Sequence, residues 1–329
     1  MKKILDKLYQ RQLLGYEEAR EILIKIAQGQ YNPSQIASFL TVFMMRGVTV
    51  QELTGFRDAL MELCLPVDFE GIETIDLCGT GGDEKNTFNI STLASFVVAA
   101  AGIPVAKHGN YGVSSISGSS NVLEFLGYQF KNDRDQLKKE LVETGICFMH
   151  APLFHPAMKT VSPIRKELGV KTFFNMLGPM VNPSKPTYQM VGVFSLELAR
   201  MYQYIYQQGN SKYAIVYGLD GYDECSLTSA TKILSGKGED IVESKDFGLK
   251  LWNQTDIHGG QSIEESARIF TQVLEGKGEQ AQVEVVLANA AIALQCCFDE
   301  QLTDSVTRAH EALQSGKALK IFNQLISMQ

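Results

Sequence analysis

The sequence lacks the cysteine spacing of a disulfide framework or a zinc site. Its six cysteines form no C-x-x-C pair and stand in apolar contexts, which indicates reduced thiols within a core. They are Cys64, Cys78, Cys147, Cys225, Cys296 and Cys297. H-E-x-x-H spacing and a Ser/His/Asp order are missing too, so hydrolase chemistry has little support.

Long hydrophobic runs and an excess of positive charge are also missing. The longest apolar run, 93–106, is too short to span a bilayer and contains Gly102 and Pro104. Charges interrupt residues 1–7, so we expect no secretory signal and no membrane partner, and predict a cytoplasmic protein. A net charge of −7 and a pI near 5.4 argue against non-specific nucleic-acid binding, which depends on Lys and Arg.

The N-terminal part of the chain has a helical pattern. With 329 residues and 45% hydrophobic content, the chain can bury a sizeable core, and its length predicts two domains. Apolar residues recur at helical spacing over 1–65. Asn32-Pro33 suits an N-cap followed by a first-turn proline, and Thr49 with Glu52 makes a capping box. We predict a small helical domain over 1–70, which could supply a dimer surface.

From Ile75 onward, short apolar runs typical of buried strands alternate with helical patterns. The runs cover 75–78, 103–106, 146–149, 189–193 and 213–217, and tail helices are expected near 263–274, 283–297 and 304–315. The alternation predicts an α/β fold, with a mostly parallel sheet flanked by helices and a smaller all-helical N-terminal domain. The irregular segment at about 165–188 is expected to join the helical domain, which leaves 71–164 and 189–329 for the α/β domain.

Two glycine-rich loops follow strands and open helices. Gly79–Asp83 ends the first strand and leads through Asn89–Thr92 into an apolar helix. Lys107–Asn110 ends the second and leads through Ser114–Ser119 into another helix. Helix N-termini present free N–H groups and a positive dipole end, which favour anions. One such loop is a weak signal, because glycine turns are common, but two in series predict a polyphosphate ligand.

An acidic loop, Gly218–Glu224, follows the strand at 213–217. It carries Asp220, Asp223 and Glu224, and carboxylate oxygens are ligands that suit Mg²⁺ together with phosphate. Taken alone, the loop is better interpreted as a solvated acidic turn. Beside two phosphate loops, a metal site becomes the better interpretation, although Asp220 could equally be a turn residue.

Arg165 and His155 have both structural and functional interpretations. A lone arginine near a helix start is usually a surface residue, but its guanidinium can also clamp a carboxylate. His155 precedes Pro156 and is better explained as a packing or loop-fixing residue than as a general base. No residue in the sequence is a compelling general base.

The ordered motifs resemble those of the anthranilate phosphoribosyltransferases, which share a fold with pyrimidine nucleoside phosphorylases. The resemblance runs nearly end to end. It is carried by Gly79–Asp83, Thr87–Thr92, Lys107–Asn110, Ser114-Ser115, His155–Met158, Arg165–Gly169, Thr172–Pro179 and Asp223-Glu224. It implies a pentosyltransferase that moves the phosphoribosyl group of 5-phosphoribosyl pyrophosphate to the amine of anthranilate, giving phosphoribosylanthranilate and pyrophosphate in the second step of tryptophan biosynthesis.

The resemblance also implies a set of binding residues. Residues expected to hold phosphoribosyl pyrophosphate are Gly79, Gly82, Asp83, Thr87, Asn89, Ile90, Ser91, Thr92, Lys107, His108, Gly109, Asn110, Gly112, Ser114, Ser115 and Ser119. Gly79, Asn110 and Arg165 are expected to hold anthranilate. Ser91, Asp223 and Glu224 are expected to bind two Mg²⁺ ions, and a homodimer through the helical domain is implied.

The chain departs from the family pattern around the second loop. Tyr111 stands where the family usually carries an arginine, and Ile116 where a lysine is common. Ser119-Ser120-Asn121 replaces the more usual Ser-Ala-Asp, and His150 replaces an apolar or aromatic residue. Tyr111 could stack on an aromatic ligand, which leaves its role open.

Two other functions fit parts of the sequence. A pyrimidine nucleoside phosphorylase would use the same fold with phosphate as co-substrate, but it has less need of Asp223 and Glu224. A non-catalytic nucleic-acid-binding paralogue would show a basic groove and damaged metal carboxylates, whereas this chain is acidic and keeps both.

Overall fold

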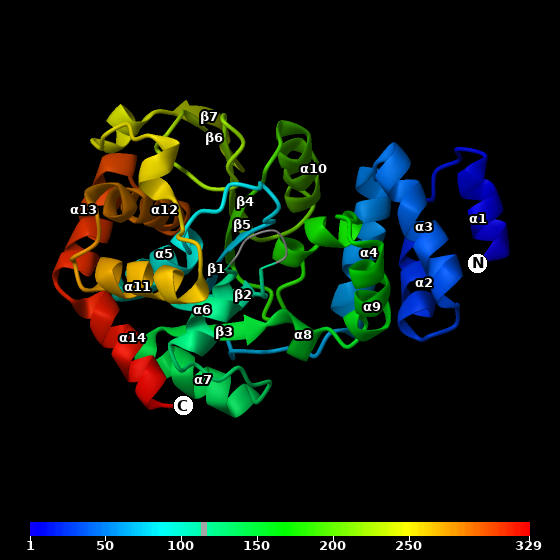
Figure 1. The fold of residues 1–329 in the computed structure, drawn as a ribbon, viewed down its shortest axis with the longest axis horizontal. Helices are drawn as coiled ribbons and strands as arrows, with labels where there is room; N and C mark the ends of the chain where they lie inside the picture. Colours follow the sequence, from blue (N-terminus) through cyan, green and yellow to red (C-terminus); the bar gives the residue numbers. More distant parts are fainter. Residues whose placement is uncertain (113–116) are drawn as a thin grey trace. The chain divides into compact units, whose positions relative to one another are not determined.

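The computed structural model describes residues 1–112 and 117–329 and divides the chain into two compact units. The helical unit comprises Met1–Val67 and Ala151–Lys185, and the α/β unit comprises Asp68–His150 and Pro186–Gln329. Both are drawn in Figure 1. The helical unit is therefore discontinuous in sequence, and its second segment begins at Ala151, earlier than the 165 expected.

The helical unit forms where the sequence supplies caps and apolar stripes. Its elements are α1 (Lys2–Tyr9), α2 (Tyr16–Ala27), α3 (Pro33–Arg46), α4 (Val50–Leu63), α8 (Ala151–Phe154), α9 (Met158–Leu168) and the 3₁₀ helices η1 (Phe173–Met176) and η2 (Gly178–Met180). Asn32 Oδ1 accepts from Gln35 N at 2.9 Å, and Thr49 Oγ1 accepts from Glu52 N at 3.3 Å. These bonds satisfy N–H groups that a helix start leaves without intrahelical partners.

Aromatic packing explains why the second segment belongs to the helical unit. Phe173 stacks on Phe56 with ring centroids 4.3 Å apart, and its ring also meets Phe43 edge to face at 5.2 Å. Helix α9 packs against α2 and α3 and buries Val161 and Ile164. The apolar face of α9 thus has its partners in the helical unit, which moves residues 151–164 out of the α/β part where they were expected.

The α/β unit is built on one sheet, whose strands within the described residues run in the order β3-β2-β1-β4-β5-β6-β7. The strands are β1 (Ile75–Gly79), β2 (Val105–Gly109), β3 (Ile146–His150), β4 (Tyr188–Gly192), β5 (Lys212–Gly218), β6 (Thr231–Ser235) and β7 (Gly238–Val242). Strands β1 to β5 are parallel, whereas β6 and β7 add an antiparallel edge. The mostly parallel sheet predicted from the sequence is confirmed.

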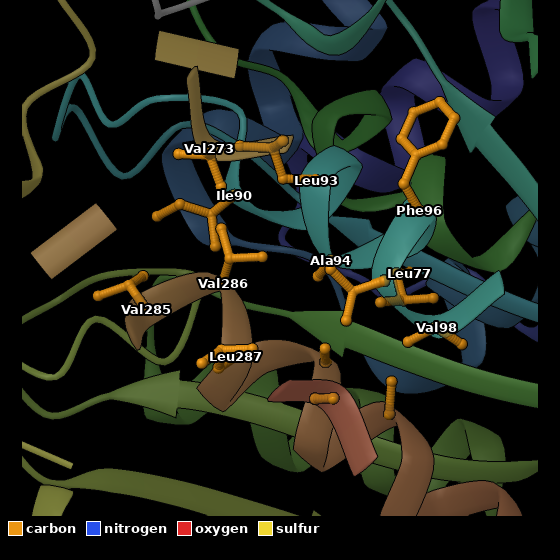
Figure 2. Close-up of a cluster of buried hydrophobic side chains, with 14 of the residues drawn as sticks. Leu77, Ile90, Leu93, Ala94, Phe96, Val98, Val273, Val285, Val286 and Leu287 are labelled. Atoms are coloured by element: carbon orange, nitrogen blue, oxygen red, sulfur yellow. The ribbon is translucent and has the colours of Figure 1, made fainter. Parts of the chain in front are cut away.

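Two apolar helices form the centre of the α/β unit's core. The helices of this unit are α5 (Ile90–Ala100), α6 (Ser119–Phe125), α7 (Arg134–Thr144), α10 (Leu196–Tyr206), α11 (Ile263–Leu274), α12 (Gln280–Phe298), α13 (Leu302–Gln314), α14 (Lys317–Ser327) and the 3₁₀ helices η3 (Ser244–Phe247) and η4 (Gln254–Ile257). Figure 2 shows Leu93 of α5 and Val286 of α12 within the shared apolar cluster. By length and composition α12 alone among the described helices could cross a membrane, but most of it is buried inside the unit, as expected of a core helix.

The strand order predicts a ligand-binding crevice beside β1. From β1 the chain moves outward to β2 and β3 on one side, and β4 lies on its other side. Such a reversal of direction opens a crevice at the carboxyl ends of the two central strands, where α/β sheets bind ligands. Gly79 ends β1, Gly192 ends β4, and the two are register partners.

Candidate active site

Asp223 sits against the ends of β1 and β4. A Cβ added to Gly79 would lie 2.5 Å from Asp223 Oδ2, and one added to Gly192 would collide with the Asp223 backbone carbonyl. Both strands therefore end in glycine because the acidic loop after β5 occupies the space of a side chain. This close approach fixes the acidic loop at the mouth of the crevice.

The first glycine loop is bonded to the same carboxylate. Gly81 N donates to Asp223 Oδ2 at 2.7 Å, and Thr80 N donates to the Gly192 carbonyl at 2.9 Å. Gly81 and Gly82 have φ of 61° and 82°, which side-chain-bearing residues rarely adopt. The glycines thus let the loop turn back over Asp223.

Three carboxylates, those of Asp83, Asp223 and Glu224, interact with one another beside the first glycine loop. Burial, followed by repulsion from the nearby Asp83, raises the pKa of Asp223 to about 7, although the hydrogen bond from the Gly81 N–H acts in the opposite direction. Burial also raises the pKa of Glu224 well above its ordinary value, with added repulsion from Asp223 and Asp83. A cation at this position would relieve the repulsion, so the donor set suits a hard metal ion.

The N-terminus of helix α5 contacts the acidic loop that carries Asp223 and Glu224. Ser91 N donates to Glu224 Oε1 at 3.1 Å. Lys107 is 2% exposed, and its Nζ donates to the Leu77 carbonyl and, at 3.5 Å, to Ser91 Oγ. The only strongly buried ammonium of the described residues therefore stands between β1 and the first turn of α5.

Several buried polar atoms around α5 lack a hydrogen-bond partner within the part of the chain that the structure describes. They are Thr80 Oγ1, Asn89 Oδ1, Thr92 Oγ1 and Ser117 Oγ. An unpaired buried polar group costs about 1–3 kcal/mol, so such atoms are normally satisfied. Clustered at a helix N-terminus, they are suited to a polar, anionic ligand.

The second glycine loop is closed by its own neighbours. A Cβ on Gly109 would lie 2.7 Å from Ser119 Oγ, and that hydroxyl donates to the Asn110 carbonyl at 3.2 Å. Asn121 Oδ1 accepts from Gly112 N and Gly118 N, both at 3.0 Å. Ser114 and Ser115, two of the predicted ligand-binding residues, and Ile116 lie outside the described residues.

Arg165 lies on α9 of the helical unit. Its Nη2 donates to Asn175 Oδ1 at 3.1 Å, and its guanidinium carbon lies 5.3 Å from the Phe174 ring centroid. Its Nε is a buried donor without a hydrogen-bond partner among residues 1–112 and 117–329, and burial lowers the pKa of the guanidinium. A buried, partly unpaired guanidinium suits a carboxylate ligand.

Comparison with known proteins agrees with this geometry. Residues 71–319 match the model of the glycosyl transferase family a/b domain, and residues 2–64 match the helical bundle domain of the same family. The anthranilate phosphoribosyltransferase of Flavobacterium johnsoniae is 60% identical over 99% of this chain and 98% of its own length. The corresponding protein of Bacteroides thetaiotaomicron is 50% identical over 100% and 99%.

Solved structures show the same fold over nearly the whole chain. An anthranilate phosphoribosyltransferase from Thermus thermophilus superposes with a TM-score of 0.91 at 32% identity and covers 98% of both chains. One from Saccharomyces cerevisiae, in complex with phosphoribosyl pyrophosphate and Mg, gives 0.92 at 28% identity over 98% and 96% of the two chains.

The chain belongs to the anthranilate phosphoribosyltransferase family. The expected activity is therefore confirmed: transfer of a phosphoribosyl group to anthranilate, a step of tryptophan biosynthesis, by an enzyme of the glycosyltransferase class. The phosphorylase and nucleic-acid-binding alternatives are set aside.

For a member of this family, sequence reasoning missed some residues of the described site. Thr80 and Ser117 carry unpaired buried hydroxyls, and Asn121 closes the second loop, but none was proposed. Their signal was available, because each lies inside a glycine- or serine-rich motif. Asp220, left open as a turn residue, accepts from Thr228 Oγ1 at 2.6 Å, and His155 Nε2 bonds the Val181 carbonyl at 2.8 Å within the helical unit.

Proposed function

We propose that the crevice at the ends of β1 and β4 binds 5-phosphoribosyl pyrophosphate. The observation that carries this is the set of unpaired buried polar atoms contributed by the first turn of α5 and by the two glycine-rich loops. The proposed ligand-binding residues are those expected from the sequence: Gly79, Gly82, Asp83, Thr87, Asn89, Ile90, Ser91, Thr92, Lys107, His108, Gly109, Asn110, Gly112, Ser114, Ser115 and Ser119. The yeast relative crystallised with this substrate supports the proposal.

We further propose that Ser91, Asp223 and Glu224 hold two Mg²⁺ ions. Within the described residues, no group of three or more His, Cys, Asp or Glu side chains forms a complete metal site. The carboxylates of Asp223 and Glu224 suit Mg²⁺, which uses one or two carboxylates and takes its other ligands from water and phosphate. When bound, Mg²⁺ would neutralise negative charge on the leaving pyrophosphate.

Anthranilate is assigned to Gly79, Asn110 and Arg165. The unpaired Nε of Arg165 supports a bond to the anthranilate carboxylate, and the ring of Phe174 holds the guanidinium in place. A relative from yeast has been solved with 4-fluoroanthranilate, an analogue of this substrate.

The protein's own residues act by binding and orientation. Loop N–H groups and Lys107 stabilise negative charge on the diphosphate, and Asn110 and Arg165 orient the amine toward the anomeric carbon. Nitrogen attack forms the C–N bond as the bond from that carbon to pyrophosphate oxygen breaks. Pyrophosphate leaves with the electron pair, and the proton of the amine passes to water or to the departing pyrophosphate. We assign no acid or base residue, because positioning accounts for a large part of such a barrier.

The assay for this function uses the fluorescence of anthranilate. The purified chain with Mg²⁺, phosphoribosyl pyrophosphate and anthranilate is expected to consume that fluorescence, and omission of Mg²⁺ to prevent it. Persistent fluorescence in the complete mixture, or phosphate-dependent cleavage of a pyrimidine nucleoside instead, contradicts the proposal.

Arg165→Ala tests the anthranilate assignment. Because a hydrogen bond to a charged group contributes about 1.5–3 kcal/mol, the anthranilate KM should rise by roughly 10- to 100-fold while that for phosphoribosyl pyrophosphate changes little. Lys166→Ala, at an exposed position on the same helix, is the control. Equal changes in both KM values would refute the clamp.

We also propose a cytoplasmic homodimer that forms through the helical unit. Large apolar side chains of α1 and α3 and the residues after α1 are exposed there: Tyr9 by 59%, Leu13 by 54%, Met44 by 41% and Met45 by 84%. Large exposed apolar side chains are what a protein interface would cover. Analytical ultracentrifugation should show a dimer that Met45→Lys weakens, and a monomeric parent protein would contradict this.

A further inference from the structure

Tyr111, Ser120, Glu124 and His150 contact one another beside the second loop, and we call them the Tyr111 cluster. The Tyr111 hydroxyl donates to Glu124 Oε1 at 2.8 Å, and its ring meets His150 edge to face with centroids 4.6 Å apart. Ser120 Oγ lies 2.9 Å from His150 Nδ1. The bond to Glu124 raises the pKa of the Tyr111 phenol, so the phenol remains a donor at neutral pH.

His150 is the fixed point of this cluster. It ends β3, pairs in register with Gly109, and is 5% exposed. The Phe130 ring stacks on it at 4.9 Å. Burial lowers the pKa of His150, so the imidazole is neutral at pH 7 and packs between two aromatic rings without a buried charge.

The backbone N–H groups of Tyr111 and Ser120 both donate hydrogen bonds to Asn110. Tyr111 N donates to Asn110 Oδ1 at 2.8 Å, and Ser120 N donates to the Asn110 carbonyl at 3.3 Å. The backbone of Asn110 is therefore held by α6, and its side chain by the residue whose ring is anchored on His150. Because this bond comes from the Tyr111 backbone, we expect a shift of that backbone, which the ring and hydroxyl contacts restrain, to change the orientation of the Asn110 amide.

The residues of this cluster coincide with the departures from the family pattern. Tyr111, Ser120 and His150 are three of the unusual residues of the sequence, and the structure brings all three into contact. The tyrosine thus contacts or lies beside other residues that depart from the family pattern. Its hydroxyl and its ring are both engaged by the protein, which disfavours the alternative in which Tyr111 stacks on the aromatic substrate.

We propose that Tyr111 is a positioning residue for anthranilate that acts through Asn110, with Glu124 and His150 as its anchors. The inference rests on the proposed role of Asn110 in binding the acceptor. Tyr111 is 41% exposed and Glu124 is exposed, so their bond contributes little to global stability. Its loss should therefore affect substrate binding more than folding.

Tyr111→Phe and Tyr111→Ala test the proposal by steady-state kinetics. Loss of one exposed hydrogen bond should raise the anthranilate KM about 3-fold in Tyr111→Phe, and loss of the ring contact about 10-fold in Tyr111→Ala. The KM for phosphoribosyl pyrophosphate should rise less than the anthranilate KM in both variants, because Asn110 is one of three residues proposed to hold anthranilate but one of sixteen proposed to hold phosphoribosyl pyrophosphate. The Tm should stay within about 2 °C of the parent protein.

Tyr188→Phe is the matched control. The Tyr188 hydroxyl donates to Glu73 Oε2 at 3.1 Å, so this pair has the same chemistry in the same unit. Tyr188 begins β4, at the end of the strand opposite the crevice. Its substitution should change neither KM.

A double-mutant cycle completes the experiment. Glu124→Ala should raise the anthranilate KM as much as Tyr111→Phe, and the double variant should be no worse than either. An unchanged anthranilate KM in an active protein overturns the inference, as does a parallel rise in both KM values together with a lowered Tm. An inactive parent protein contradicts the transferase function, and the inference with it.

Discussion

The first glycine loop is held by a side chain from a distant part of the chain, whereas the second is held by its own neighbours. Gly81 bonds Asp223, which is 142 residues away, and Gly79 has room only for a hydrogen against it. In the second loop, Gly112 bonds Asn121, only nine residues away. The first loop therefore depends on the acidic loop after β5, whereas the Gly112 backbone of the second is bonded within its own segment and its Tyr111 side chain reaches His150 of β3.

Gly192→Ala should cause the largest loss of stability and activity, because it displaces Asp223, the residue that holds the first glycine loop. The added Cβ would collide with the Asp223 backbone, which cannot move without the acidic loop. We expect a loss of about 3 kcal/mol in the free energy of unfolding, typical of overpacking, together with loss of activity. Urea unfolding and the fluorescence assay measure the two.

Two glycine substitutions calibrate that result. Gly109→Ala meets only the Ser119 hydroxyl, which can rotate away, so its cost should be smaller. Gly236→Ala, where a Cβ meets nothing within 4 Å, should be close to neutral. If Gly109→Ala destabilises the protein as much as Gly192→Ala, the contrast between the loops is wrong.

Asp223→Asn should separate stability from activity in the first loop. The amide oxygen can still accept from Gly81 N, but a carboxylate repelled by Asp83 and Glu224 is removed. We expect an unchanged or raised Tm, with kcat/KM lowered by roughly 100-fold or more because charge stabilisation at the reacting group is lost. Leu219→Asn, exposed at the start of the same loop, is the control. A lowered Tm would show that the carboxylate stabilises the fold.

Sequence reasoning could predict the first loop's glycines and the acidic pair, but not that they touch. Apolar runs located β1 to β5 because those strands are buried, whereas β7 is exposed along most of its length and gives no such signal. The bond from Gly81 to Asp223 depends on the order of the strands, which periodicity does not encode. Likewise, Tyr111 and His150 are far apart in the sequence, where each is an unusual residue with no visible link to the other. Only the pairing of β2 with β3 brings them together.

Asn289→Ala tests whether helix α12, in the core, holds the acidic loop in place. Asn289 on α12 accepts from Cys225 N at 3.1 Å and donates to the Cys225 carbonyl at 2.8 Å, directly after Glu224. Removing both bonds leaves buried backbone groups unpaired and should cost about 2 kcal/mol in the free energy of unfolding. The concentration of Mg²⁺ needed for half-maximal activity should also rise, because Glu224 loses its fixed position. A change in stability with no change in that concentration would confine Asn289 to the core.

Asn121→Ala should have the smallest effect, since it breaks only local support of the second loop. It removes the acceptor that joins Gly112 N and Gly118 N, but both amides lie near the surface, where water can replace the lost bonds. We therefore expect a Tm within about 2 °C of the parent and a rise of about 3-fold in the KM for phosphoribosyl pyrophosphate. Asn121→Asp keeps the acceptor oxygen and should restore the parent KM, whereas Asn121→Leu, of similar volume but without an acceptor, should not. A collapse of stability in Asn121→Ala would instead show that the second loop is as deeply coupled to the fold as the first.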